Sequence, residues 1–297
     1  MSERIGSGLV VVDKPSGLTS HDVVGRLRKL LGTRKIGHAG TLDPMATGVL
    51  VLGVGRATRL LGHLALDTKA YTATIRLGAA TSTDDAEGEI VSSADASAIG
   101  RDAVLAGMAA LTGDIEQVPS TVSAIKVDGK RAYARARAGE DVVLVARPVT
   151  VSEFVLLAVR TDGPHLDLDV TVECTSGTYV RALARDLGAG LGVGGHLTAL
   201  RRTRVGPFEL DTARTLEQLA EDPGLTHPLD TAVATAFRVR VADAEEAAAL
   251  SFGRALDAAG LAGVYAVTDT DGRALALVSE VEGRAKPMLV LAPAGGG

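Results

Sequence analysis

Residues 37–54 read Gly-His-Ala-Gly-Thr-Leu-Asp-Pro-Met-Ala-Thr-Gly-Val-Leu-Val-Leu-Gly-Val, a glycine-rich loop that runs directly into an apolar strand. The glycines permit unusual backbone dihedrals and close approach of other groups, while Pro44 biases Asp43 toward an extended conformation. The segment therefore displays one carboxylate, Asp43, ahead of the strand. Because Asp-Pro is a common turn former, the spacing alone leaves open whether Asp43 shapes a turn or reacts.

Strands and helices alternate on both sides of this loop. Apolar residues at helical spacing predict a helix that Ser20 caps and Gly32 ends, and alternation over residues 71–77 predicts a half-buried strand with Tyr71 on its core-facing side. The same signals predict strands over 8–12, 49–54, 122–127, 149–159, 166–174 and 196–205, and helices over 57–66, 101–111, 130–138 and 179–187. The excursion at about 120–147 contains a basic helical stretch and is expected to project as an arm.

The C-terminal part has a different pattern. Asp222-Pro223-Gly224 and His227-Pro228 mark a linker zone, and short strands are predicted over 264–268, 274–278 and 287–291. We therefore expect an α+β chain with one domain over 1–232 and a small β-domain over 239–297.

Composition narrows the class of protein. The chain has 297 residues, 46% of them hydrophobic, which is enough to bury a substantial core. No apolar run is long enough to span a membrane and no export signal begins the chain, so we expect a cytoplasmic protein without a membrane partner. Its single cysteine, Cys174, excludes an internal disulfide and a cysteine-based zinc cluster, and is expected to be buried.

Charge is distributed unevenly along the chain. The net charge is -5, but residues 207–297 hold 14 acidic and 7 basic residues, so residues 1–206 carry +2. Three basic groups flank the motif loops, and each could be a solvated face or a phosphate-binding surface. The groups are Arg26, Arg28, Lys29, Arg34 and Lys35; Lys126, Lys130, Arg131, Arg135 and Arg137; and Arg201, Arg202 and Arg204.

The string from Gly37 to Arg59, GHAGTLDPMATGVLVLGVGRATR, resembles the catalytic motif of the bacterial tRNA pseudouridine-55 synthase family, the TruB type. Further blocks agree in order, and together they cover roughly residues 8 to 210. These blocks are residues 12–20, 69–71, 76–78, 84–88, 117–120, 123–126, 176–181 and 200–202. The tail resembles a small PUA-type RNA-binding barrel more weakly, and a generic β-domain remains an equal alternative.

The resemblance implies a fold and a reaction. The fold is a pseudouridine synthase domain with a central, mostly antiparallel mixed sheet flanked by helices and loops, followed by a PUA-like β-barrel. The reaction is isomerisation of uridine-55 in the T-loop of tRNA, with the base flipped out of its stack and no cofactor or metal. Asp43 is implied as the catalytic carboxylate, Tyr71 as the residue that stacks on the uracil, and Arg181 as the partner that keeps the aspartate ionised.

The resemblance also implies substrate-binding roles. Lys14 would support the active-site loop, His38 would pack against the T-loop, and Asp85 would hold the geometry of the pocket. Tyr179 and Leu200 would line that pocket. We place Lys126, Lys130 and Arg202 among the tRNA-binding residues because they belong to the basic groups.

The expected partner is the T-stem and loop of tRNA, bound by a monomer without an obligate protein partner. With 3% aromatic residues, continuous stacking along single-stranded RNA is disfavoured. One alternative function is an RNA-binding or tRNA-folding protein without catalysis. The other is a hydrolase, which would need a second carboxylate from Asp84, Asp85 or Glu87 to activate water.

Overall fold

In a computed structural model, the described residues are 5–65, 68–120, 126–127, 130–131 and 144–294. Two sheets organise them: a ten-stranded sheet built from residues before 229 and a five-stranded sheet built from residues after 238. Most of the expected arm, including the strand over 122–125 and the stretch over 132–138, lies outside the described residues. Lys130–Arg131 forms strand β9, paired with β8 (Lys126–Val127), so the helix expected from residue 130 does not begin there.

The large sheet is mixed. Strands β3 and β12 pair in parallel at Arg201↔Thr47 and Arg202↔Gly48, whereas the other neighbouring pairs are antiparallel. This junction brings the segment that follows Asp43 beside a strand about 150 residues later in the chain. The strand order is β14 (His227–Pro228), β1 (Gly8–Lys14), β3 (Thr47–Val54), β12 (Gly195–Val205), β4 (Lys69–Leu77), β11 (His165–Cys174), β10 (Arg147–Asp162) and β7 (Gly113–Gln117), with β2 (Ile36–Ala39) added to β3 and β13 (Phe208–Glu209) to β12.

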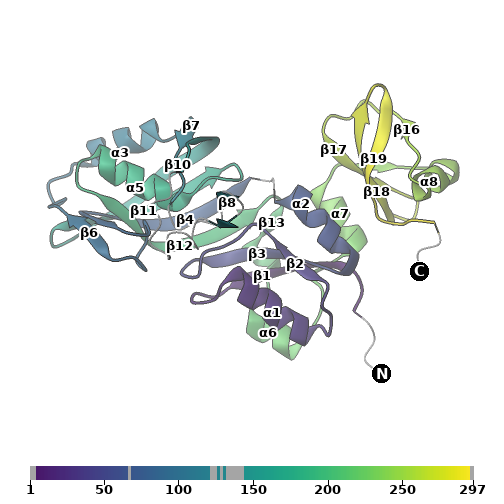
Figure 1. Cartoon of the computed structure of the whole chain (residues 1–297), viewed down its shortest axis with the longest axis horizontal. Helices are drawn as coiled ribbons and strands as arrows, with labels where there is room; N and C mark the ends of the chain where they lie inside the picture. Colours follow the sequence, from purple (N-terminus) through teal and green to yellow (C-terminus); the bar gives the residue numbers. More distant parts are fainter. Residues whose placement is uncertain (1–4, 66–67, 121–125, 128–129, 132–143, 295–297) are drawn as a thin grey trace.

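One half of the sheet packs against two helices. Helices α3 (Arg101–Ala110) and α5 (Val180–Gly190) lie together over the half formed by β4, β12, β11 and β10 (Figure 1). Burial alternates strictly along β4, so Tyr71, Ala73 and Ile75 join Val180, Leu183 and Leu187 of α5 in one core. The expected alternation over 71–77 and the expected burial of Tyr71 and Cys174 are both confirmed.

The other half has cores on both faces because β1 and β3 are buried throughout nearly their whole length. On one face, Val10, Val12, Leu50 and Leu52 pack with α1 (Ser20–Leu30) and α6 (Leu216–Glu221). On the opposite face, Leu9, Val11, Val49 and Val51 pack with the 3₁₀ helix η1 (Gly55–Leu60), α2 (Leu61–Leu64) and α7 (Leu229–Ala236). Continuous apolar runs in β1 and β3 follow from this double burial.

Two local sequence predictions were wrong. Thr19, not Ser20, caps α1: its hydroxyl accepts from the Asp22 amide and the Asp22 carboxylate accepts from the Thr19 amide, which completes a capping box. Ser20 is already helical and buried. The helix expected over 57–66 is instead η1 followed by the single turn α2, with residue 66 outside the described range.

The C-terminal sheet is ordered β15 (Val239–Val241), β17 (Val264–Thr268), β18 (Ala274–Val281), β19 (Arg284–Val290) and β16 (Leu256–Asp257), with α8 (Ala244–Ser251) beside it (Figure 1). The structure thus has a C-terminal half-barrel. It is anchored to the large sheet through η1: Arg56 and Arg59 donate to the carbonyl oxygens of Leu291 and Val290 at 3.1 and 2.8 Å. Smaller elements are β5 (Ala79–Thr81), β6 (Ile90–Ser93) and η2 (Leu210–Thr212).

Candidate active site

Asp43 lies in the loop between β2 and β3, with one third of its side chain exposed. Its neighbour Leu42 is buried and held by Ser20, whose hydroxyl donates to the Leu42 carbonyl at 3.1 Å and accepts from its amide at 2.9 Å. The Ala46 amide donates to the Asp43 carbonyl at 3.1 Å and closes a turn. The two sequence interpretations of Asp43 are therefore compatible, because its backbone shapes a turn while its carboxylate projects from it.

Lys14 lies beneath this loop and is fully buried. Its ammonium donates to the carbonyl oxygens of Pro15, Leu18 and Pro44 at 3.0, 2.7 and 3.2 Å. Burial lowers the pKa of Lys14 to about 8, and the nearby Asp43 carboxylate acts against this shift. Lys14 thus joins the end of β1 to the residue that follows Asp43.

Arg202 holds the other side of the loop. Its side chain is 1% exposed and donates to the carbonyl oxygens of Val49, Thr41 and Gly40 at 2.7, 3.3 and 3.3 Å. A side chain at Gly48 would lie 2.1 Å from the Arg202 carbonyl oxygen, and Gly48 has φ +100°, so only glycine permits this approach. The expectation that Arg202 offers its charge to RNA does not fit this burial. Leu200 is buried and Arg202 lies two residues later on the same strand, so alternation of buried and exposed positions along β12 predicts that Arg202 is buried as well.

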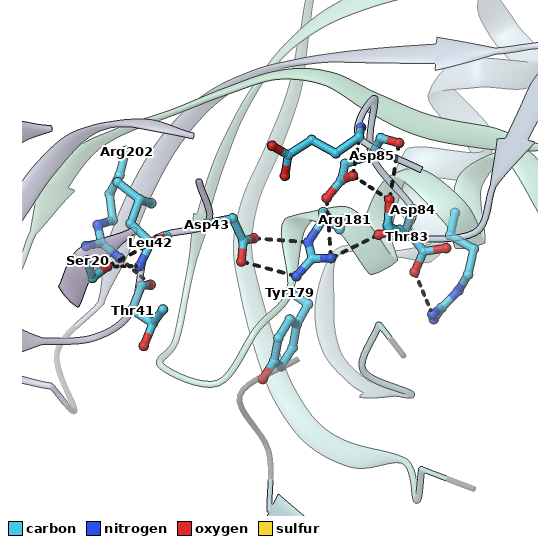
Figure 2. A network of polar contacts seen from close by, with 12 residues as sticks. Ser20, Thr41, Leu42, Asp43, Thr83, Asp84, Asp85, Tyr179, Arg181 and Arg202 are labelled. Atoms are coloured by element: carbon cyan, nitrogen blue, oxygen red, sulfur yellow. Dashed lines mark hydrogen bonds and ion pairs between the residues drawn. The ribbon is translucent and has the colours of Figure 1, made fainter. Parts of the chain in front are cut away.

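Arg181 connects Asp43 to a second acidic loop. From α5, its guanidinium makes two contacts with the Asp43 carboxylate, Nε to Oδ2 at 3.0 Å and Nη2 to Oδ1 at 3.2 Å. Its Nη1 donates to the Thr83 carbonyl at 2.9 Å and lies 3.4 Å from Asp85 Oδ2. Figure 2 shows Arg181 between Asp43 on one side and Thr83 with Asp85 on the other. Since Arg181 and Asp85 are buried, Asp43 is the exposed end of this network.

Tyr71 and Leu200 lie in the core next to the loop. They are 8% and 7% exposed and belong to the same apolar cluster as Leu42. Tyr71 is paired with Arg202 across β4 and β12. Burial raises the pKa of the Tyr71 phenol, and the Arg202 cation acts against this shift.

Tyr179 and His38 are held by different elements. The backbone of Tyr179 is fixed by Gln117, which accepts from its amide at 2.8 Å and donates to its carbonyl at 3.2 Å. The ring of Tyr179 extends away from the Asp43–Arg181 pair (Figure 2). The sequence predicts that His38 lies in the loop, but the structure places it on strand β2. Its ring meets the ring of His21 edge to face, with the ring centroids 5.5 Å apart.

The basic groups differ in exposure. Arg26, Arg28, Lys29, Arg34 and Lys35 are all exposed on and after α1. Arg201 pairs with Asp13 at 2.7 Å and Arg204 with Glu173 at 2.7 Å, so the third group is largely engaged within the protein. The backbones of Lys126 and Lys130 are described, but their side chains are not. The first group is therefore the exposed basic surface nearest Asp43 in sequence.

Two features are absent from the described residues. No helix in those residues is long and apolar enough to cross a membrane. Within the same residues, no cluster of three or more histidine, cysteine or acidic side chains could hold a metal ion.

Comparisons with known proteins agree with one another. The model for the N-terminal domain of the TruB family of pseudouridylate synthases matches residues 28–180. The model for the tRNA pseudouridylate synthase B C-terminal domain matches residues 181–234, and the one for the C-terminal part of tRNA pseudouridine synthase II matches residues 237–292.

Curated relatives and solved structures extend the match over the whole chain. The tRNA pseudouridine synthase B of Nocardia farcinica is 67% identical, covering 97% of this chain and 94% of the relative. That of Rhodococcus jostii is 64% identical, covering 99% and 96%. Among solved structures, a chain of a Cbf5–Nop10–Gar1 complex has a TM-score of 0.74 at 27% identity, covering 98% of this chain and 86% of its own. A chain of an H/ACA ribonucleoprotein bound to a substrate RNA containing 2′-deoxyuridine has a TM-score of 0.73 at 25% identity, covering 97% and 86%.

Proposed function

This chain belongs to the TruB family of pseudouridylate synthases, and we propose that it isomerises uridine-55 in the T-loop of tRNA to pseudouridine. The observation that carries the proposal is the partly exposed Asp43 carboxylate, held by two contacts with the buried Arg181. Such a two-point contact between a guanidinium and a carboxylate fixes the orientation of the carboxylate. An oriented anion is what a reaction at the anomeric carbon of a nucleoside requires.

The chemistry is an isomerisation in which atoms and electrons balance. The bond from N1 of uracil to C1′ breaks, a bond from C5 to C1′ forms, C5 gives up a proton and N1 takes one. No electron donor or acceptor is consumed, so the reaction needs no cofactor. We assign Asp43 as the catalytic carboxylate that attacks or stabilises the electron-poor centre during this exchange.

Tyr71 is assigned as the face on which the flipped uracil stacks and as the proton carrier at C5. Burial raises the pKa of this phenol, so Tyr71 is protonated at neutral pH and must pass its proton on before it can take the one from C5. Leu200 and Tyr179 would flank the base, and His38 would contact the T-loop. Lys14, Asp85 and Arg202 would act through the protein, since each is buried and holds the Asp43 loop or Arg181.

The RNA is recognised, in this proposal, by the folded shape of the T-stem and loop and by phosphate contacts. The exposed basic residues on and after α1 support it, and Lys126 and Lys130 of the arm are assigned to the same task. We assign residues 1–232 to catalysis and the half-barrel over 239–297 to a PUA-like role in RNA binding. We further propose that the protein acts as a monomer in the cytoplasm.

A hydrolase would need a second carboxylate to activate water. Asp84 is ion-paired with Arg185 at 3.2 Å and Asp85 lies against Arg181 at 3.4 Å, which disfavours either as a general base. Glu87, the third candidate, is exposed on the same loop, so isomerisation is favoured by membership of the TruB family and not by the lack of a second carboxylate.

The test is to incubate the purified chain with unmodified tRNA transcript, without cofactors, and to map pseudouridine chemically. We expect one modified position in the T-loop, and no product from Asp43→Asn, which should still bind tRNA within about tenfold of the parent, or about 1.4 kcal/mol. Free uracil would indicate hydrolysis instead. Tight binding without product from the parent chain would indicate an RNA-folding protein and defeat the proposal.

A further inference from the structure

A second arginine on α5 reaches the same acidic loop as Arg181. Arg185 follows Arg181 by one helical turn, so the two side chains lie on one face of the helix. The Arg185 guanidinium contacts Asp84 Oδ2 at 3.2 Å, Asp186 Oδ1 at 2.8 Å and the carbonyl oxygen of Val118 at 2.6 Å. Arg185 thus joins the loop between β5 and β6 to the chain that follows β7.

Asp84 has a backbone that needs such support. Its φ is +61°, a left-handed conformation that is uncommon for a residue with a side chain. It is nevertheless buried, and its carbonyl oxygen accepts from the Leu197 amide of β12 at 3.0 Å. A strained residue persists only where its surroundings determine its position. The Arg185 ion pair and the Leu197 hydrogen bond together supply that determination.

The residues on either side of Asp84 are those that hold Arg181. Thr83 offers its carbonyl oxygen at 2.9 Å and Asp85 its carboxylate at 3.4 Å. Asp85 is itself oriented by the Thr83 hydroxyl at 2.5 Å and by the Glu87 amide at 3.1 Å. Because Asp84 lies between these two contacts, any movement of its backbone moves both of them.

We propose that Arg185 is a positioning residue which, through Asp84, sets the place of Arg181 and hence the orientation of the Asp43 carboxylate. The kinetic part of this inference rests on the proposed function, whereas its structural part does not. Arg185 touches neither Asp43 nor Arg181 among the contacts described, so its effect passes through the loop. A displacement of about 1 Å at a reacting group can reduce a rate by about a hundredfold, and a loosened loop should cost less than that.

The ion pair between Asp84 and Arg185 is more buried than the pair between Arg160 and Asp169 on strands β10 and β11 of the large sheet. The side chains of Asp84 and Arg185 are 12% and 28% exposed, whereas Arg160, which pairs with Asp169, is 51% exposed. Ion pairs as exposed as Arg160–Asp169 contribute little to stability. Among the contacts described, neither residue of that pair touches Asp43, Arg181 or the loop that holds Asp84. Arg160→Gln is therefore a suitable control for the loss of an arginine elsewhere.

The experiment compares Asp84→Asn with Asp186→Asn in the full chain. Both variants neutralise one carboxylate that contacts the same Arg185 guanidinium, but only Asp84 belongs to the loop. Arg185→Gln removes the cation, and Arg185→Lys keeps a charge that can reach Asp84. The first readout is amide hydrogen exchange at Leu197 and Glu87, whose N–H groups bond to Asp84 and Asp85. The second is the single-turnover rate at saturating tRNA, together with the dissociation constant.

We expect exchange at both amides to accelerate about tenfold in Arg185→Gln, and at least threefold in Asp84→Asn. Asp186→Asn and Arg160→Gln should match the parent. The single-turnover rate should fall by about the same factors, with the dissociation constant within twofold of the parent, and Arg185→Lys should recover most of the lost rate. The double variant Asp84→Asn with Arg185→Gln should be no slower than Arg185→Gln alone, because both changes break the same contact.

The inference is overturned if Asp84→Asn and Asp186→Asn behave alike, or if Arg185→Gln leaves both exchange and rate within twofold of the parent. It is also overturned if the loss appears only as weaker tRNA binding or as a lower melting temperature. The exchange measurement requires no activity. If the parent makes no pseudouridine, the proposed function fails, while exchange still decides whether Arg185 holds the loop.

Discussion

Replacing Lys14 by methionine should change how the stability of the protein depends on pH. Methionine keeps the length and apolar stem of the side chain but removes the ammonium that donates to Pro15, Leu18 and Pro44. Burial holds the pKa of Lys14 at about 8 in the folded chain, against 10.5 when exposed. Folding therefore disfavours the charged form, in contrast to a lysine that gains a carboxylate partner.

The sign and size of the effect follow from proton binding. Between pH 8 and 10.5 the unfolded chain holds the Lys14 proton and the folded chain has lost it, so stability rises with pH in this window. Across the whole window, this one group should raise the free energy of unfolding by about 3 kcal/mol, since each unit of difference in pKa corresponds to about 1.4 kcal/mol. From pH 7 to 9.5, the free energy of unfolding of the parent should therefore increase by about 2 kcal/mol relative to that of Lys14→Met.

Urea unfolding followed by far-ultraviolet circular dichroism at several pH values measures this difference, and the subtraction cancels groups that titrate equally in both proteins. Carbon-13 labelling of lysine gives an independent check, because the signal of Lys14, identified by its loss in Lys14→Met, should titrate near pH 8. A parent-minus-variant difference that stays constant within about 0.5 kcal/mol from pH 7 to 9.5 would refute the reasoning.

Further outcomes are expected at other positions. Tyr71→Phe should bind tRNA nearly as well as the parent but lose at least a hundredfold in single-turnover rate, because the proton carrier is removed and the ring kept; near-normal kinetics would reduce Tyr71 to a stacking surface. Arg34→Gln with Lys35→Gln should lower the slope of log affinity against log salt by about 1 to 2, whereas Arg284→Gln with Lys286→Gln, on the C-terminal sheet, should leave it unchanged. Cys174, whose pKa burial raises to about 11, should resist thiol reagents at pH 8 until the chain unfolds, and rapid labelling of the native protein would contradict its burial. Gly48→Ala should destabilise the chain by more than about 2 kcal/mol in a urea titration, because φ is +100° and the added carbon meets the Arg202 carbonyl; a smaller loss would mean that β3 and β12 can separate.

Much of the fold could be predicted because local pattern and burial agree. The alternation in β4 and the double burial of β1 and β3 are visible in sequence, and these strands form where expected. The strand order could not be obtained this way. The parallel pairing of Thr47 with Arg201 depends on contacts between distant segments, about which periodicity carries no information.

The errors in the site have physical causes. Serine suits a helix cap, so the pattern favours Ser20, but Thr19 suits the position equally and has Asp22 three residues later to complete the capping box. Arg202 was grouped with its basic neighbours, although its spacing from Leu200 places both on one face of β12. Bulges between Leu197 and Ala199 and between Arg202 and Arg204 interrupt that alternation, which weakened the signal.

The role of Arg185 could not be inferred from sequence at all. Nothing in the helix pattern distinguishes it from a solvated arginine, and its partner Asp84 is one of several acidic residues in its segment. Only the left-handed backbone of Asp84 and the two contacts beside it reveal what the pair supports.

The dependence of the Asp43 loop on Arg181 and Arg202 also constrains the order of events during synthesis. The residues that fix this loop leave the ribosome long after it, since Arg181 follows Asp43 by 138 positions and Arg202 follows Thr41 by 161. At roughly 5–20 residues per second, this is a delay of several to some tens of seconds. A nascent chain that already exposes Asp43 therefore has an unassembled site, and it cannot modify RNA until nearly the whole large sheet has been made.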